Sequence, residues 1–519
     1  MSEVDLPTLA KTGRSAAESK SQFALKEVNL ALKECGYGFF HVRLMLAVFV
    51  GLVTGVIMGS TSSYILSEAE CDFDLDLVDK GVLNAMPYLG MLTSSIVAGF
   101  LTDAFGRKTF AVLGCGGTFV FTFLSGLSQS FVMITIAKFS EGVFFAAAYS
   151  SMLTLTSEFY HDGVRDRIML ITSAAIPLGQ VIVALMSWGI LIQDWKVSFF
   201  DGTFVLHTWN YYFLILSLWA LLGTIQYILL PESPMFYISQ KKYDKAREVL
   251  IKVYKENTGK PAETFKYKDL WKEKHLLMQR QSISPASQLS NAFHNIRPMF
   301  RMPLLGYLTL FCVLNFISMT LYTVLRMWFP QLSAMFEHYS SESSDICVII
   351  DSYSKDLKLK TLPERDEVCI PARSGAESYI NSLILGSICC IPPIISGVLV
   401  NKVGKRNLYI VCGFITMLVT IAMRWTNSKV AMVALFSSDV AISTLMASLT
   451  QTMVLQHFPT TTRSLAVAIV MTMGRTGCVS GNILFPILLD MGCAVPFFSL
   501  AAIVGVTTGL AFLISSKNE

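Results

Sequence analysis

The chain has 519 residues, of which 53% are hydrophobic and only 15% are charged. Because an average soluble domain carries about 25% charged residues, this composition indicates a membrane protein. A formal net charge of +4, with no basic stripe interleaved with aromatic residues, argues against a nucleic-acid partner.

Residues 1–41 lack the apolar core of a cleavable signal peptide, so we expect them to form a cytoplasmic N-terminal tail. Apolar runs of about 20 residues, the length that crosses a bilayer, then recur along the chain. Twelve of them begin near residues 42, 80, 109, 131, 166, 208, 302, 378, 407, 429, 462 and 493. The sequence therefore predicts an all-α membrane protein with twelve transmembrane helices.

Loop charges orient the predicted helices, because Lys and Arg concentrate in cytoplasmic loops. The segment 232–301 contains fourteen of these residues, whereas the connection from Glu68 to Asp79 is acidic. Both termini and the segment 232–301 are therefore predicted to be cytoplasmic. Within that segment, residues 240–254 have the spacing of an amphipathic helix, which either lies against the membrane or is solvated.

An internal repeat divides the chain into two halves. The string 99–108, after the second predicted helix, recurs as 397–406 after the eighth. Both strings carry two glycines, an Asp or Asn and a basic pair in one register. We therefore expect two pseudo-symmetric six-helix bundles, 42–231 and 302–516, the second with an external loop at 331–376.

The string 99–108 resembles the G-x-x-x-D-x-x-G-R-R/K signature of the major facilitator superfamily. Pro231-Glu232-Ser233-Pro234 resembles a mark of the sugar and organic-ion transporter branch of that superfamily. Within the branch, the chain looks most like the synaptic vesicle glycoprotein 2 family, on strings such as Trp328-Phe329-Pro330.

This resemblance implies a secondary-active transporter that moves a small organic solute, an organic anion or a sugar, across the lipid bilayer by alternating access. It implies coupling to H⁺ or Na⁺, and a location in the plasma membrane or in a secretory or synaptic-type vesicle.

The chain departs from the family pattern in the first helix, where Gly55 and Met58 replace an acidic pair, and at Gln456, where many relatives have Glu. These departures keep a second function open: a non-transporting receptor or regulatory membrane protein of the synaptic vesicle glycoprotein 2 type. An enzyme is not expected, since the sequence contains no phosphate-binding loop, zinc motif or nucleophile elbow. No cofactor and no metal site are predicted.

The resemblance also implies a conformational latch at the cytoplasmic ends of the helices. In it, Asp103 holds the two halves in the outward-facing state, Gly106 permits a tight turn, and Gly99 permits close helix approach. The other expected members are Arg107, Lys108, Glu158, Arg165, Glu232 and Arg463. Alternatively, Arg107 and Lys108 serve only as positive anchors at the membrane surface.

Charged residues inside the predicted spans are costly, so they are candidates for function. Arg475, near the middle of the eleventh helix, either binds an anionic substrate or forms a structural ion pair with Glu141 or Asp439. Glu141 is a candidate proton site or a structural partner of an arginine, and Asp439 is expected near the external surface. Arg326 precedes Pro330 by one turn, so we expect its side chain to reach water at the outer end of the seventh helix.

Neutral polar side chains at mid-span depth are candidates for the remaining substrate contacts, because a small polar solute needs donors and acceptors that replace water. They are Ser62, Tyr149, Gln180, Asn315, Tyr322, Gln451 and Asn482. Asn and Gln also join helices in lipid, and that role stays open for them. Phe and Met side chains are expected to pack or to face lipid.

Seven of the eleven cysteines lie in or beside apolar runs. Cys347 and Cys369 lie in the predicted external loop, where a disulfide across about 20 residues would contribute roughly 3 kcal/mol. We expect these two cysteines to pair.

Overall fold

The computed structural model describes residues 27–199, 201, 204–271, 301–339, 345–360, 374–458 and 462–514. The first half of the chain forms α2 (Phe39–Ile65), α3 (Leu77–Phe105), α4 (Arg107–Gly126), α5 (Phe131–Glu158), α6 (Asp162–Ser173), α7 (Ala175–Leu191) and α8 (Thr208–Leu229). The second half forms α13 (Leu304–Tyr339), α15 (Ala376–Ile388), α16 (Ile391–Val403), α17 (Lys405–Ala422), α18 (Lys429–His457), α19 (Arg463–Asp490) and α20 (Ala494–Ala511).

Shorter elements connect these helices. α9 (Pro234–Ser239), α10 (Tyr243–Thr258) and the 3-10 turn η2 (Ala262–Thr264) lie between the halves, α14 (Ile346–Lys360) precedes α15, and the 3-10 turn η4 (Met423–Trp425) follows α17. Between α7 and α8, β1 (Val197–Phe199) and β2 (Phe204–Leu206) form an antiparallel hairpin in which Ser198 lies opposite Val205.

The described residues contain eleven helical segments that are long and apolar enough to cross a membrane, with α6 and α7 together forming one of them. The remaining predicted span, the eighth, begins near residue 378 and is divided into α15 and α16, each of 13 residues. Pro392 lies in the first turn of α16, where a missing amide hydrogen is tolerated. The predicted all-α fold with twelve spans is therefore confirmed, with one span broken.

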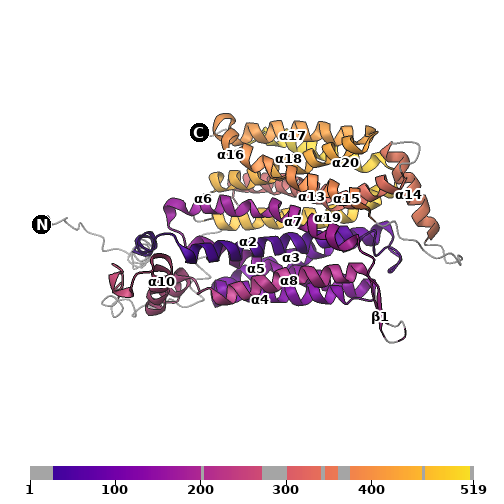
Figure 1. Cartoon of the computed structure of the whole chain (residues 1–519). Coiled ribbons are helices and arrows are strands. Elements are labelled where there is room, and N and C mark those ends of the chain that lie inside the picture. Colours follow the sequence, from indigo (N-terminus) through magenta and orange to yellow (C-terminus); the bar gives the residue numbers. More distant parts are fainter. Residues whose placement is uncertain are drawn as a thin grey trace.

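The two halves lie side by side along their whole length (Figure 1). Across the boundary, α3 packs against α19, α7 against α15, and α2 against α13. One end of the bundle carries α10 and is called the α10 end; the opposite end carries α14 and the β1–β2 hairpin and is called the α14 end (Figure 1).

The internal repeat has a structural counterpart in two glycines. Gly106 separates α3 from α4 with a φ of +114°, and Gly404 separates α16 from α17 with a φ of +81°. Both angles lie in the region that favours glycine, so each glycine permits a sharp turn between consecutive helices.

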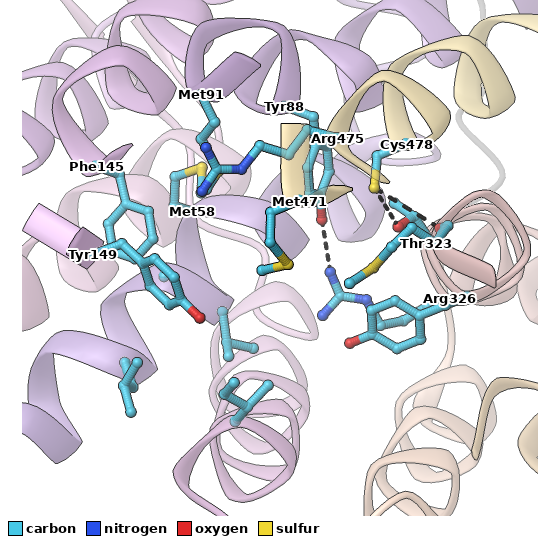
Figure 2. Close-up of a pocket in the computed structure, with 16 residues that line it drawn as sticks. Met58, Tyr88, Met91, Phe145, Tyr149, Thr323, Arg326, Met471, Arg475 and Cys478 are labelled. Carbon is cyan, nitrogen blue, oxygen red and sulfur yellow. Dashed lines mark hydrogen bonds between the residues drawn. The ribbon is translucent and has the colours of Figure 1, made fainter. Parts of the chain in front are cut away.

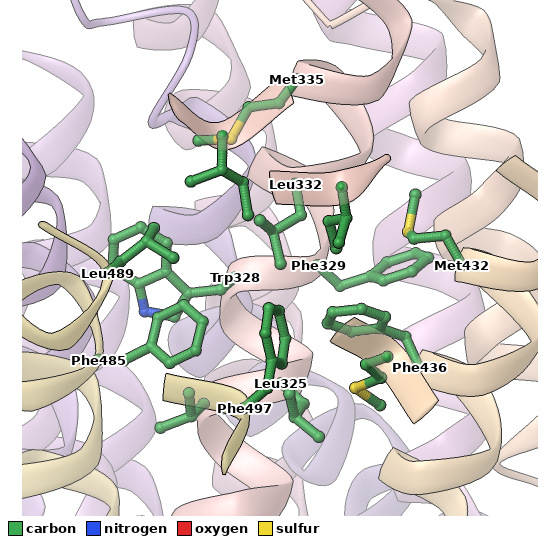
Figure 3. Packing of buried hydrophobic residues seen from close by; sticks show 14 of the residues in the cluster. Leu325, Trp328, Phe329, Leu332, Met335, Met432, Phe436, Phe485, Leu489 and Phe497 are labelled. Carbon is green, nitrogen blue, oxygen red and sulfur yellow. The ribbon is translucent and has the colours of Figure 1, made fainter. Parts of the chain in front are cut away.

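The largest apolar cluster lies inside the second half, toward the α14 end. Figure 3 shows Trp328 of α13 packed on Phe485 of α19, with ring centroids 5.3 Å apart, and Phe329 packed on Phe436 of α18, at 5.8 Å. This cluster joins α13, α18, α19 and α20 into one body, because close side-chain packing is what holds helices together in lipid.

α13 is longer than expected. It has 36 residues and continues through Pro330 to Tyr339, so the predicted external loop does not begin at 331. At 1.5 Å per residue the helix is about 54 Å long, well beyond the bilayer's apolar core. Residues that seemed to be at its outer end therefore lie deeper in the bundle.

The apolar face of α10 packs on the first half of the protein, whereas the sequence suggested a helix that lies against the membrane or is solvated. Tyr243, Ala246 and Leu250 of its apolar face are buried in the cluster that contains the start of α2. Arg43 forms an ion pair with Glu256 at 3.0 Å, which fixes the helix against the first half.

The predicted Cys347–Cys369 disulfide is wrong, because Cys347 is bonded to Cys493 at the start of α20. Cys369 lies outside the described residues. The start of α14 lies beside the residue that precedes α20, so Cys347 and Cys493 are 5.2 Å apart between Cα atoms although 146 residues separate them in sequence. An ion pair between Asp345 and Arg424, at 3.2 Å, adds a second link between α14 and the second half.

Candidate functional site

A cavity of about 180 Å³ lies between the two halves, near the middle of the bundle. The first half contributes residues of α2, α3, α5 and α7, and the second half contributes residues of α13 and α19. Its wall consists of Leu52, Gly55, Val56, Met58, Tyr88, Met91, Phe145, Tyr149, Ile176, Met319, Tyr322, Thr323, Arg326, Met471, Arg475 and Cys478. The described wall thus combines two arginines and three tyrosines with a mostly apolar surface, and contains neither Asp nor Glu.

Arg475 lines this cavity, as one of its two predicted roles requires (Figure 2). α19 comes close to α13 at Gly477, where a Cβ would meet the carbonyl oxygen of Phe316, and this close approach positions Arg475 at the interface. The alternative ion pair is not formed with either expected partner. Glu141 pairs with Lys138 at 2.6 Å, and Asp439 accepts a hydrogen bond from Thr420 at 2.6 Å.

Arg326 also lines the cavity, and the expectation that its side chain reaches water is wrong. Arg326 is only 8% exposed, because α13 continues beyond Pro330 and so keeps Arg326 inside the bundle. The guanidinium donates to the Tyr88 hydroxyl at 2.8 Å and to Gln180 Oε1 at 3.0 Å. Arg326 therefore reaches from the second half to α3 and α7 of the first half.

Aromatic and methionine side chains form much of the cavity wall, which differs from the expectation that they only pack or face lipid. Tyr149 and Tyr322 line it, as predicted. Met58, Met471 and Tyr88, which were not predicted, line it as well (Figure 2). Met58 lies in a mostly apolar helix, and nothing in the sequence indicated that this apolar side chain, and not its neighbours, would face a cavity.

Five of the predicted substrate contacts lie outside the cavity wall: Ser62, Gln180, Asn315, Gln451 and Asn482. Asn315 donates to the Val470 carbonyl at 2.8 Å and so joins α13 to α19. Asn482 donates within its own helix, and Gln180 acts on the cavity only through Arg326. Four of these five residues are buried and Gln451 is partly buried, so polarity within a predicted span did not separate helix contacts from cavity contacts.

Glu141 lies behind the cavity wall in a fully buried ion pair with Lys138. Lys138 also donates to the carbonyl oxygen of Met58 at 3.0 Å and to Thr61 at 2.8 Å, while Thr122 donates to Glu141 at 2.6 Å. The proton-site role of Glu141 stays a prediction. Asp439 is fully buried, and its expected position near the external surface stays a prediction.

The predicted latch residues gather at the α10 end. Arg107 contacts Asp103 at 3.1 Å and Glu158 at 3.4 Å, and all three belong to the first half. Glu232 accepts hydrogen bonds from the backbone amides of Lys108, at 3.0 Å, and Ser233, at 2.9 Å. Because α4 begins at Arg107, it is Glu232 and not Asp103 that caps a helix N-terminus.

The remaining latch residues have local contacts. Arg165 donates to the Ser157 carbonyl at 3.0 Å, and Arg463 donates to the Phe458 carbonyl at 3.4 Å. A Cβ at Gly99 would meet no described atom within 4 Å, so close helix approach there is not observed. Gly106 makes the predicted turn, and a Cβ at that position would run into the Glu232 carboxylate.

At the α14 end, a buried polar cluster joins the two halves. Lys80 of α3 forms an ion pair with Glu70 at 2.7 Å, and the side chains are 0% and 2% exposed. Tyr353 of α14 donates to Glu70 at 2.8 Å and accepts a hydrogen bond from Lys80. Burial, together with the Glu70 charge, raises the pKa of Tyr353 well above its ordinary value, so its hydroxyl stays a donor at neutral pH.

Comparisons with known proteins agree with this architecture. The sugar (and other) transporter family matches residues 47–326, and the Major Facilitator Superfamily matches residues 378–518. The solved structure of the xylose transporter XylE from E. coli, in a partially occluded inward open conformation, superposes with a TM-score of 0.63 at 14% identity, covering 93% of this chain and all of that one. A D-xylose-proton symporter gives the same TM-score and identity, over 92% of this chain and 97% of its own.

Curated relatives include synaptic vesicle glycoprotein 2A from Homo sapiens, which is 25% identical over 257 residues, and synaptic vesicle glycoprotein 2B from Rattus norvegicus, 25% identical over 252 residues. These matches cover 49% and 48% of this chain, but only 34% and 37% of the relatives. The chain thus matches about a third of the length of these relatives. Since one family matches more than half of its residues, the chain belongs to the sugar (and other) transporter family and has the major facilitator fold.

Proposed function

We propose that this protein is a secondary-active transporter that carries a small organic anion by alternating access. Membership of the sugar (and other) transporter family supports transport of a small solute. The observation that supports an anion is Arg475, which lines a cavity between the halves whose described wall contains no carboxylate. A guanidinium in a mostly apolar wall is costly unless a counter-charge joins it, and an anionic solute supplies that charge.

The position of the contacts between the halves supports a state closed at the α14 end. Ser63 contacts Met327 at 2.8 Å, Ser67 contacts Ser374 at 2.9 Å, and Tyr64 stacks on Tyr379 with ring centroids 6.3 Å apart. Between described residues at the α10 end, the hydrogen bonds and ion pairs stay within one half. In the proposed cycle, the latch at the α10 end engages the second half only when the α14 end opens.

The charged residues of segment 232–301 support a cytoplasmic α10 end and an external α14 end. Protease added from the cytoplasmic side is expected to cut within 232–301 and to leave 331–376 intact. Cleavage of 331–376 from that side would reverse the proposed orientation.

Uptake into liposomes that contain the purified protein tests the transport proposal. A panel of small organic anions, sugars and organic cations is compared for the unmodified chain, for Arg475→Gln, and for Arg301→Gln, which removes an exposed arginine at the α10 end. Loss of one charge-assisted contact is expected to lower anion uptake by about tenfold or more in Arg475→Gln alone. Uptake of sugars but not anions would overturn the anion assignment.

A second candidate function is a non-transporting receptor or regulator. The observation that favours it is the α2 part of the cavity wall, where Gly55 and Met58 stand in place of the acidic pair expected for the family. Binding of an anion without flux of any solute in the panel would decide for this candidate.

A further inference from the structure

The cavity holds a second arginine that the proposed function does not use. Arg326 and Arg475 project into the same space from α13 and α19 (Figure 2). Both helices belong to the second half, and they pack directly on each other. Two like charges on one wall repel, so the arrangement needs a stabilising partner.

Among the described residues, the Arg326 guanidinium contacts neutral groups. It donates to Tyr88 and Gln180 and lies over the Tyr322 ring, 5.0 Å from the centroid. Gln180 Oε1 is shared, because Ser60 also donates to it at 3.3 Å. The Nε of Arg326 is buried and has no hydrogen-bond partner among the described residues. The charge is therefore held by dipoles and remains uncompensated.

The buried carboxylates of Glu141, Glu70 and Asp439 do not supply the missing charge. Glu141 is neutralised by Lys138, and Glu70 by Lys80. Asp439 accepts hydrogen bonds from Thr420 and Ser443 in the second half, and it is not part of the cavity wall. Two positive charges thus face the cavity, and a solute with a single negative charge would compensate only one of them.

We infer that the transported solute carries two anionic groups, one for each arginine, joined by an apolar body. This inference rests on the proposed function and names the class of anion. In the view of Figure 2, the Met471 side chain lies between the two guanidinium groups. Met471, Met319 and Met58 give this part of the wall an adaptable apolar surface, which suits the body of such a solute.

Arg326 then has two roles in the cycle. Without solute, it bridges the halves by donating to Tyr88 of α3 and Gln180 of α7. With solute, one anionic group takes donors of this guanidinium, so the bridge to the first half is weakened as the site is filled. Binding of the second anionic group to Arg326 therefore weakens a contact between the halves and so favours their separation.

The inference is tested by binding to the purified full chain at neutral pH, where carboxylic acids with pKa values near 4 are ionised. The probes are the linear dicarboxylates from malonate to suberate, each paired with the monocarboxylate of equal length. The series covers a range of spacings between the charges. For the best length, the dicarboxylate is expected to bind about tenfold more tightly than its monocarboxylate, because it makes a second charge-assisted contact.

Two variants assign the preference to Arg326. Arg326→Gln is expected to bring the dicarboxylate affinity down to that of the monocarboxylate, and Arg326→Lys, which keeps the charge, is expected to retain a preference. In Arg475→Gln, Arg326 is the remaining cavity arginine, so monocarboxylates are expected to bind through it, and the preference for dicarboxylates is expected to be lost. If Arg326→Gln does not fold, the ratio measured on the unmodified chain and on Arg326→Lys still decides.

The outcomes separate this inference from the proposed function. Equal affinity for both members of every pair, with carboxylate binding retained, would overturn the two-charge inference and leave the anion proposal standing. A preference that survives Arg326→Gln would also overturn it. Absence of carboxylate binding in the whole series would overturn the anion proposal itself.

Discussion

The two ends of the bundle use ionic contacts in opposite ways. At the α14 end, Lys80 and Glu70 are almost fully buried and contact Tyr353, so the ion pair of the first half is bonded to a helix of the second. At the α10 end, Arg107 bridges Glu158 and an Asp103 carboxylate that is 73% exposed, all within one half. The described contacts that hold the halves together are therefore concentrated at the α14 end.

This difference indicates which end limits the movement between the halves. α14 is fixed to the second half by the Cys347–Cys493 disulfide and by the Asp345–Arg424 ion pair. Its contacts with the first half include the hydrogen bonds of Tyr353 with Glu70 and Lys80, which can break and re-form. If the halves rock as proposed, α14 moves with the second half, and the Tyr353 contacts open.

The largest effect is expected from breaking the buried pair at the α14 end. Lys80→Met leaves the Glu70 carboxylate buried without its cation, which costs about 3–5 kcal/mol of unfolding free energy. The matched change at the α10 end, Asp103→Asn, removes an exposed charge and should cost about 1 kcal/mol or less. Thermal unfolding of the purified variants in detergent measures both.

A double variant gives the decisive control for this pair. Lys80→Met combined with Glu70→Gln removes both charges, so it should be more stable than Lys80→Met alone. A double variant that loses the sum of the two single losses would show that the two residues act independently, contrary to the structure.

The second effect concerns the attachment of α14. Cys493→Ser removes the disulfide, and a loss of about 2–4 kcal/mol is expected because the unfolded chain is no longer cross-linked. Cys347→Ser should give the same loss, and the double variant should lose no more than either. Additive losses, or a Cys347 peptide cross-linked to another cysteine in a non-reduced digest, would contradict the assigned pairing.

Hydrophobic length predicted most of the fold because a spanning helix must be apolar over its whole length. Predicted starts near 80, 131 and 429 compare with observed starts at Leu77, Phe131 and Lys429. Helix ends were not predictable at two prolines, because proline is compatible with both the interior and the first turn of a helix. Pro330 lies inside α13 without ending it, whereas Pro392 lies in the first turn of a new helix, and spacing along the sequence does not distinguish these cases.

The site was less predictable than the fold, because facing a cavity is a property of three-dimensional packing. Arg475 was identified from its cost at mid-membrane depth, but Arg326, which has the same cost, was misplaced along with the end of α13. Cys347 had a plausible partner nearby in sequence, and its true partner is 146 residues away. That pair forms because the start of α14 lies beside the residue that precedes α20 in the folded chain.

The smallest effect tests the turn at the α10 end. Gly106 has a φ of +114°, and a Cβ there would displace the Glu232 carboxylate from the amide of Lys108. Gly106→Ala is therefore expected to cost about 1–3 kcal/mol of unfolding free energy. Gly99→Ala is the matched control, since its Cβ enters open space inside α3, where Ala should stabilise the helix by about 0.5–1 kcal/mol. Equal changes in stability for the two variants would show that the turn at Gly106 and the Glu232 cap contribute no more to stability than an ordinary helical glycine.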